Sequence, residues 1–304
     1  MTNQQVNEFI LARDFTENTV KQYMNSFSRF ENMEYDLIKA NQSVINEFVY
    51  NLKDPNGKEY SANSKLTLLG FAIALRKHYK KPFIKIVKAK QHWKDAFRIK
   101  QAETNKSKLE NLPSVAELEA HENKLFRDAD WQGFIVTYLL RNLHSRNADL
   151  NFKIIAPTRA TRKIKDGDKS NYLTLRVNDV GVVRSSYKTV QQYGVKKDRL
   201  RSRKLQTAMK NFIDDKGMEL GKEPIYLFSK GKNEPLDEYS IAKAIRKHTL
   251  YNLSENDYNK IQVTEFLEKK KWRKLEQVSK LRGTKLDTLL QYYGLSYTKE
   301  DEEE

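Results

Sequence analysis

Apolar side chains that recur at steps of three and four residues are the feature that most constrains the fold of this chain. The stripe is clearest over residues 16–30, and it returns over 44–52 and 61–81. This spacing matches the turn of an amphipathic α-helix that buries one face. The turn sequence DPNG at 54–57 separates the second segment from the third. Residues 1–100 are therefore predicted to form a compact helical domain.

The periodicity changes after this region. Residues 101–113 are polar, have no apolar period and end in proline, which is typical of a linker between domains. Residues 171–178 and 181–187 alternate apolar and polar side chains like the strands of a hairpin. Helical patterns surround these strands, and an acidic tail occupies 299–304. We therefore expect a second domain over 114–304 that is mainly α-helical with a small antiparallel β-sheet.

The charge of the chain points to a polyanionic partner. Its 304 residues include 56 lysines and arginines against 40 acidic residues, a formal net charge of +16, which favours nucleic acid. The chain has no cysteine, and its five histidines lack HExxH spacing, so we expect no disulfide and no metal cofactor. No apolar run approaches the ~18 residues that span a membrane, and no signal peptide is evident. We expect an intracellular protein of the cytoplasm or nucleoid, or of the nucleus in a eukaryotic host or virus.

Basic residues are grouped in three segments that are candidates for contact with DNA. One ends the helix predicted over 61–81, the second is the string KKDRLRSRK at 196–204, and the third lies on a helix predicted after Asp237. Such runs are commonly solvated surface, but their sign matches the excess charge of the whole chain. Neutralisation of phosphates by these residues would supply most of the affinity for DNA. The candidate DNA-binding residues are Arg76, Lys77, Lys80, Lys81, Lys196, Lys197, Arg199, Arg201, Arg246 and His248.

Several common catalytic sequences are absent. The chain has no GxxxxGK[ST] phosphate-binding loop, no GxGxxG segment after a strand and no GxSxG nucleophile turn. A basic protein without cysteine that acts on DNA still has tyrosine as a nucleophile, with arginine and lysine to neutralise phosphate charge. Attack of a phenol on a phosphodiester gives a covalent phosphotyrosine and needs no metal.

Three strings carry a family resemblance. The string LRGTKLDTLLQYY at 281–293 resembles the LGHSSISTTxxY motif of the tyrosine recombinase, or phage integrase, family. The motif's spacing puts the nucleophile on Tyr292, with Tyr293 as the alternative if the register shifts by one residue. Upstream, LLRNLHSRNADLNF resembles the family's TGLRISELLAL and puts Arg146 in the place of its first arginine. The string VVRSSYKT puts Lys188 in the place of its β-hairpin lysine.

The family's second box, HxxR, is not matched. The usual spacing puts Asp257 in the place of its histidine and Lys260 in the place of its arginine. The string KAIR, which ends at Arg246, has the arginine that the HxxR box requires, but it lies too early in the chain. Gly283 stands where the family has its second histidine. A lysine neutralises a phosphate as a point charge, but it does not bind two oxygens in one plane as arginine does.

The resemblance covers nearly the whole chain, because FTENTVKQYMNSFSRF and YSANSKLTLLGFAIALRKHY are similar to helices of the family's core-binding domain. It implies a SAM-like core-binding domain, a catalytic domain, and a site-specific recombinase or integrase of a mobile genetic element or virus. In the implied reaction Tyr292 forms a 3′-phosphotyrosyl bond, Arg146 and Lys260 brace the phosphate, and Lys188 protonates the leaving 5′ oxygen, with Asp257 at the same site. The implied partners are double-stranded DNA and further copies of the chain in a tetramer, and no cofactor is implied.

Two other functions fit the same residues. The substitutions at Asp257, Lys260 and Gly283 are compatible with a DNA-binding protein that kept the fold and lost the chemistry. A type IB topoisomerase or telomere resolvase would share the tyrosine chemistry without strand exchange, although the recombinase-like N-terminal helices argue against a topoisomerase.

Overall fold

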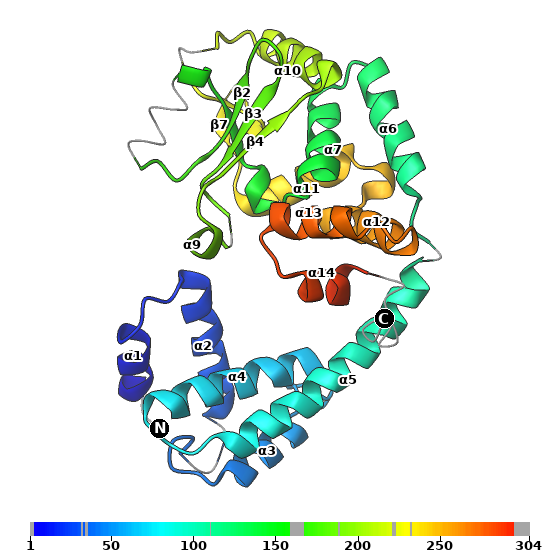
Figure 1. Ribbon diagram of the computed structural model, residues 1–304. Coiled ribbons are helices and arrows are strands. Elements are labelled where there is room, and N and C mark those ends of the chain that lie inside the picture. Colours follow the sequence, from blue (N-terminus) through cyan, green and yellow to red (C-terminus); the bar gives the residue numbers. More distant parts are fainter. Residues whose placement is uncertain are drawn as a thin grey trace. The chain divides into compact units, whose positions relative to one another are not determined.

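The computed structural model describes residues 3–31, 33, 36–109, 111–158, 167–187, 189–220, 223–231 and 233–294. The chain separates into two compact units, Met1–Thr104 and Asn105–Glu304, and each has a hydrophobic core of its own (Figure 1). Among the described residues, no helix is both long and apolar enough to cross a membrane.

The N-terminal unit is helical, as its apolar stripes predict. Its helices are α1 (Asn3–Leu11), α2 (Glu17–Phe30), α3 (Gln42–Asn51), α4 (Ala62–His78) and the first part of α5 (Ile84–Leu109). Side-chain oxygens of Thr16, Asn41 and Ser61 accept hydrogen bonds from the first turns of α2, α3 and α4, which fixes where these helices begin. The core between the helices is rich in aromatic side chains, with Phe9 and Phe71 fully buried.

The segment predicted as a linker, 101–113, is helical over most of its length. Helix α5 continues to Leu109, and the division between the two units falls inside this segment. Its lysine, glutamine, alanine and glutamate residues favour a helix without producing an apolar period. No glycine or proline interrupts the helix before Pro113, so the polar composition here does not mean an irregular chain.

The C-terminal unit contains a five-stranded sheet in the order β4–β3–β2–β1–β5. Its strands are β1 (Phe152–Ile154), β2 (Asn171–Leu175), β3 (Val180–Arg184), β4 (Lys196–Leu200) and β5 (Ile225–Tyr226). Strands β2 and β3 form the hairpin predicted from the alternating segments. All neighbouring pairs are antiparallel except β1 and β2, which run parallel. A second, antiparallel pair joins β6 (Ser229–Lys230) to β7 (Glu234–Pro235).

Helix α7 lies at the centre of the C-terminal unit. It packs against α6, α10, α11 and α12, and its Ile135, Leu139 and Leu140 are fully buried. The helices of this unit are α6 (Val115–Arg127), α7 (Trp131–Leu143), α9 (Val190–Tyr193), α10 (Arg203–Asp215), α11 (Glu238–His248), α12 (Glu255–Glu268), α13 (Trp272–Arg282) and α14 (Leu286–Tyr293) (Figure 1).

Helices α12, α13 and α14 pack on one another around a small core of buried aliphatic side chains. Helix α13 ends at Gly283, whose φ of +63° lies in the left-handed region that glycine adopts without strain. This turn leads the chain into α14, and the hydroxyl of Thr264 on α12 donates to the carbonyl of Tyr293 at 3.4 Å. The helix that carries both candidate tyrosines is therefore fixed beside α12.

Candidate functional site

Buried and half-buried charged side chains lie together where the ends of α7, β3 and α13 come close in the C-terminal unit. The guanidiniums of Arg146, Arg184 and Arg282 form what we call the arginine cluster. Arg146 follows α7, Arg184 ends β3 and Arg282 ends α13. All three lie near Asp149. Burial raises the pKa of the Asp149 carboxyl, and the three guanidiniums lower it without cancelling the effect of burial.

The end of helix α7 brings His144 and Arg146 to this position. His144 adopts a left-handed conformation, φ 49° and ψ 36°, that ends the helix and redirects the chain. The backbone N–H of Arg146 then donates to the carboxylate of Asp149 at 3.2 Å, which closes the turn. Burial, together with the charge of Arg282, lowers the pKa of His144 to about 3, so its imidazole is neutral near pH 7.

Strand β3 contributes an arginine on a face that is otherwise apolar. Val180, Val182 and Arg184 alternate along the strand and share the face turned towards the core. The Arg184 side chain is 1% exposed. Its Nη2 donates to the carboxylate of Asp198 at 3.1 Å, and its Nη1 donates to the carbonyl of Leu281 at 3.0 Å. These bonds connect the sheet to the end of helix α13.

Arg282 forms a buried ion pair with Glu255 at 2.6 Å, and the two side chains are 2% and 6% exposed. Its Nη1 also donates to the carbonyl of His144 at 3.1 Å. Burial alone would lower the pKa of Arg282, but the interactions with Glu255 and Tyr293 together outweigh it and the net shift is upward. The pair therefore joins the first residue of α12 to the last residue of α13 with the guanidinium charged.

Two N–H groups of the arginine cluster have no hydrogen-bond partner among the described residues. They are Nη1 of Arg146 and Nε of Arg184, and both are buried. The hydroxyls of the neighbouring residues Ser145 and Ser185 are also buried and have no hydrogen-bond partner among the described residues. Buried polar groups in folded proteins are nearly always paired, and a charged donor left unpaired is especially unfavourable. The cluster thus presents donors suited to an anionic ligand.

Helix α14 brings a tyrosine hydroxyl to this cluster. The hydroxyl of Tyr293 accepts a hydrogen bond from Nη2 of Arg282 at 2.6 Å and donates to Oδ1 of Asn256 at 3.3 Å. Tyr292, the predicted nucleophile, is the preceding residue of the same helix, and its side chain lies outside the described part of the chain. The structure therefore places the helix of the predicted nucleophile at the cluster.

The other predicted catalytic residues have different positions. Lys188 lies outside the described residues. Asp257 closes a capping box at the start of α12, where its carboxylate accepts from the backbone N–H of Ser254 at 3.0 Å. The ammonium of Lys260 lies 3.3 Å from Oδ1 of Asn105. These contacts are with groups outside the arginine cluster, and the catalytic roles of Asp257 and Lys260 stay predictions.

The residues one position earlier on α12 meet the cluster. Asn256 contacts the Tyr293 hydroxyl, and the side-chain amide of Asn259, which is fully buried, lies 3.3 Å from the carboxylate of Glu255. These two asparagines have the same three-residue spacing as the predicted pair, but they stand on the face of α12 that meets the cluster. Counting residues back from Leu281 does not fix this face, because each step rotates a helix by about 100°.

The predicted DNA-binding residues fall into three groups. Arg76 is 4% exposed and its guanidinium donates only to backbone carbonyls inside the N-terminal unit, so it is corrected to a structural residue. Lys196 and His248 are partly buried, and Nδ1 of His248 pairs with Asp130 at 3.1 Å. The remaining candidates are exposed: Lys77, Lys80, Lys81, Lys197, Arg199, Arg201 and Arg246.

Several residues of the site were not predicted from the sequence: His144, Arg184, Glu255, Asn256 and Arg282. For Arg184 a signal was present, since an arginine on the buried face of an alternating strand calls for a partner or a ligand. The others have no such signal. Their places in the site depend on contacts between separate segments, such as that of Arg282 with the carbonyl of His144, 138 positions earlier.

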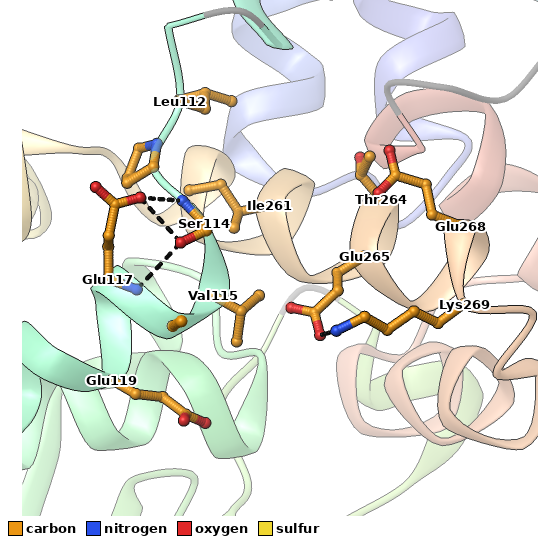
Figure 2. Close-up of a pocket in the computed structure, with 12 residues that line it drawn as sticks. Leu112, Ser114, Val115, Glu117, Glu119, Ile261, Thr264, Glu265, Glu268 and Lys269 are labelled. Carbon is orange, nitrogen blue, oxygen red and sulfur yellow. Dashed lines mark hydrogen bonds and ion pairs between the residues drawn. The ribbon is translucent and has the colours of Figure 1, made fainter.

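A separate groove lies between the start of α6 and the second half of α12 (Figure 2). It measures about 670 Å³, which is ample for a small ligand. Its lining includes the carboxylates of Glu117, Glu119, Glu265 and Glu268, whereas the lysine there, Lys269, is paired with Glu265. This acidic groove is unsuited to a phosphate. It therefore does not compete with the arginine cluster as a nucleic-acid site.

Comparison with known proteins connects this geometry to one fold. No protein-family model and no curated protein matches the sequence. The crystal structure of a lambda integrase dimer bound to a COC′ core site is similar, with a TM-score of 0.53 and 12% identity over 97% of this chain and 79% of that chain. A crystal structure of XerA recombinase gives a TM-score of 0.39 and 13% identity over 100% of this chain and 96% of that chain.

The likeness to lambda integrase shows that the chain has the fold of the tyrosine recombinases. The predicted fold class, mainly α-helical with a small sheet, is confirmed, although one pair of strands in the sheet is parallel.

Proposed function

We propose that this protein cuts and rejoins DNA through a covalent phosphotyrosine formed by a tyrosine of helix α14. The observation that carries the proposal is the arginine cluster, where unpaired buried donors of Arg146 and Arg184 lie beside Arg282, which contacts the hydroxyl of Tyr293. Guanidiniums match the geometry of phosphate oxygens and neutralise their charge. A phosphodiester bound by these donors would lie next to a phenol.

Tyr292 is the proposed nucleophile, because it has the motif's spacing. Its phenolic oxygen loses its proton to water and forms a bond to phosphorus, while the bond from phosphorus to the 5′ oxygen of the next sugar breaks. Lys188 gives its proton to that oxygen, and the reverse steps rejoin the strand. Tyr293 is proposed to hold α14 against the cluster through Arg282 and Asn256. Asp257 and Lys260 have no part in this scheme.

Double-stranded DNA is the proposed substrate, and the protein is proposed to assemble on it, with a tetramer as the working form. Phosphate contacts would come from exposed basic residues of both units, and the N-terminal unit would act as a clamp on the duplex. These residues are Lys77, Lys80 and Lys81 of the N-terminal unit and Lys197, Arg199, Arg201 and Arg246 of the C-terminal unit.

A DNA-binding protein without cleavage activity is the second candidate. It is favoured by the neutral amides of Asn256 and Asn259 on the face of α12 that meets the cluster, and by the absence of a side chain at Gly283. Such a site would still bind a phosphate through the arginines. At these three positions it would lack groups that move a proton.

The two candidates are separated by a trapping experiment with a pool of nicked duplexes of randomised sequence. Each nick lies close to a possible cleavage point, so that the short strand released by cleavage diffuses away and the covalent complex accumulates. We expect the wild-type protein to give DNA complexes that resist SDS, and their sequencing yields the preferred site. Wild-type protein that binds the duplexes and gives no such complex would support the binding-only function.

Matched variants assign the nucleophile. Tyr292→Phe is expected to abolish the covalent complex while DNA binding persists. Tyr293→Phe keeps the ring and loses only the hydroxyl that contacts Arg282, so it should form the complex at a reduced rate. The opposite pattern would make Tyr293 the nucleophile and would correct the register of the motif by one residue.

A further inference from the structure

Lys196 lies beside the arginine cluster on the neighbouring strand. In the antiparallel pairing of β3 with β4, it stands directly opposite Arg184. Like charges at directly opposed positions of a sheet are destabilising. Asp198 forms an ion pair with Arg184 at 3.1 Å, but none of the described carboxylates lies within ion-pair distance of the Lys196 ammonium. Positive charge is therefore in local excess here.

The ammonium of Lys196 is held at the end of helix α13. It donates to the carbonyl of Lys280 at 2.5 Å and to the carbonyl of Leu281 at 3.1 Å. The carbonyl of Leu281 also accepts from Nη1 of Arg184 at 3.0 Å, so two cations share one acceptor. An ammonium has three donors, and these carbonyls use two of them. One donor of Lys196 remains for a ligand.

Gly283 leaves room for this arrangement. A Cβ atom at position 283 would lie 2.5 Å from Oγ1 of Thr189, which is too close, and 3.0 Å from Nζ of Lys196, a tight contact in which the ammonium must give way slightly. The hydroxyl of Thr189 donates to the carbonyl of Gly283 at 2.9 Å. The space that a side chain of residue 283 would occupy is thus taken by the Thr189 hydroxyl and by the ammonium of Lys196, a residue of β4.

We propose that Lys196 is the fourth cation of the phosphate site and donates to an oxygen of the same phosphate that the arginine cluster binds. This inference rests on the proposed function only in taking the ligand to be a phosphate. The simpler alternative is that Lys196 only caps the carbonyls at the end of α13, where the helix dipole favours a cation. Capping explains two of its donors. It does not explain the like charge placed directly opposite on β3.

The electrostatics of the site agree with an anion between these groups. Burial lowers the pKa of Lys196 to about 8, and Arg184 and Arg146 act in the same direction, whereas Asp198 and Asp149 oppose them. The rings of Tyr187 and Tyr193 also lie near the ammonium. A bound phosphate would favour the charged form of Lys196 and would offset the repulsion from the arginines.

The first test measures the binding of inorganic phosphate to the full-length protein by isothermal titration at pH 7. Lys196→Met is expected to weaken phosphate binding about tenfold or more, the effect of one charge-assisted hydrogen bond. Lys210→Met, which removes an exposed lysine of α10, should bind phosphate as the wild type does. Equal affinity for Lys196→Met and wild type would overturn the proposal, and so would a wild-type protein that does not bind phosphate.

The second test uses the cleavage site recovered from the trapping experiment. On a normal duplex, Lys196→Met is expected to form the covalent complex about 100-fold more slowly, as is typical when one donor to a developing oxyanion is lost. On a duplex whose scissile phosphate is an uncharged methylphosphonate, the deficit should shrink to roughly threefold, because the charge that Lys196 neutralises is absent. An equal deficit on both duplexes would make Lys196 a structural cap and would refute the proposal.

A glycine variant tests the same point without changing the lysine. Gly283→Ala forces the hydroxyl of Thr189 to move and crowds the ammonium of Lys196, so it is expected to weaken phosphate binding in the same direction as Lys196→Met. Gly217→Ala is the matched control, because Gly217 also has a positive φ, +59°, but a Cβ there meets nothing within 4 Å. Equal phosphate affinity for the two alanine variants would contradict the proposal. Absence of a covalent complex from wild-type protein would defeat the proposed function alone, since the phosphate measurements stand without cleavage.

Discussion

Replacement of Arg76 by methionine is predicted to destabilise the N-terminal unit and to leave DNA binding by the folded protein unchanged. Nε of Arg76 donates to the carbonyl of Pro82 at 2.6 Å, and Nη1 donates to the carbonyls of Leu37 and Ala40 at 2.9 Å each. Each buried carbonyl left unpaired costs about 1–3 kcal/mol. Removal of a buried charge offsets part of that loss. We expect the free energy of unfolding of this unit to fall by about 3 kcal/mol.

Hydrogen exchange of the full-length protein measures this change in the N-terminal unit. A loss of about 3 kcal/mol speeds exchange of the most protected amides of α2 and α4 by about 100-fold, because 1.4 kcal/mol corresponds to a factor of ten. Lys77→Met is the control, since this neighbouring side chain is exposed, and its effect on stability should stay within about 0.5 kcal/mol. Unchanged protection together with weaker DNA binding in Arg76→Met would refute the structural role.

Three further predictions follow from individual contacts. Hydrogen bonding to His248 lowers the pKa of Asp130. The ionised carboxylate of Asp130 therefore stabilises the fold above the unfolded pKa of about 3.9, and this contribution is lost as the pH falls through the folded pKa. Asp130→Asn keeps the N-cap, so its free energy of unfolding in urea should be lower than wild type at pH 7 and converge with it at acid pH. Glu255→Gln leaves Arg282 buried without its counter-ion and should lower the free energy of unfolding by about 3 kcal/mol. The double variant with Arg282→Gln should lose less than the sum of the two single losses, and additive losses would argue against the pair. Arg199→Gln removes one exposed cation of β4 and should reduce the slope of log affinity for DNA against log salt by about 0.9, whereas an unchanged slope would exclude a phosphate contact there.

Helices and strands with one apolar face were predictable because burial imposes their period. The helix predicted over 16–30 is α2, and the alternating segments at 171–178 and 181–187 contain β2 and β3. The same periodicity bears on Arg76, which was predicted as a DNA contact from its basic neighbours. Arg76 follows Leu69 and Ala72 at steps of three and four residues, so it continues their buried stripe. The DNA-contact prediction for Arg76 rests on its basic neighbours and leaves out its place in the buried stripe of the helix.

The candidate site was predictable only where a motif fixes both the residue and its helix face. The motif puts Arg146 at the cluster and the predicted nucleophile on the helix that reaches it. The spacing of the second box selects Asp257 and Lys260, whereas the side chains of α12 that meet the cluster come from Asn256 and Asn259. Arg184 donates to the carbonyl of Leu281, the residue before Arg282, although 97 positions separate Arg184 from Leu281. Both guanidiniums also lie near Asp149. No local pattern encodes such a contact, because it depends on how β3 packs against the end of α13.

Identification of the amino acid that becomes linked to DNA tests the central claim most directly. After the trapped complex is digested with nuclease and protease, mass spectrometry locates the residue that carries the nucleotide. We predict a nucleotide linked to Tyr292, within the peptide of helix α14 that lies at the arginine cluster. A nucleotide on a tyrosine outside α14, or no linked nucleotide on protein that binds the duplex, would contradict the assignment of this cluster as a site of DNA cleavage.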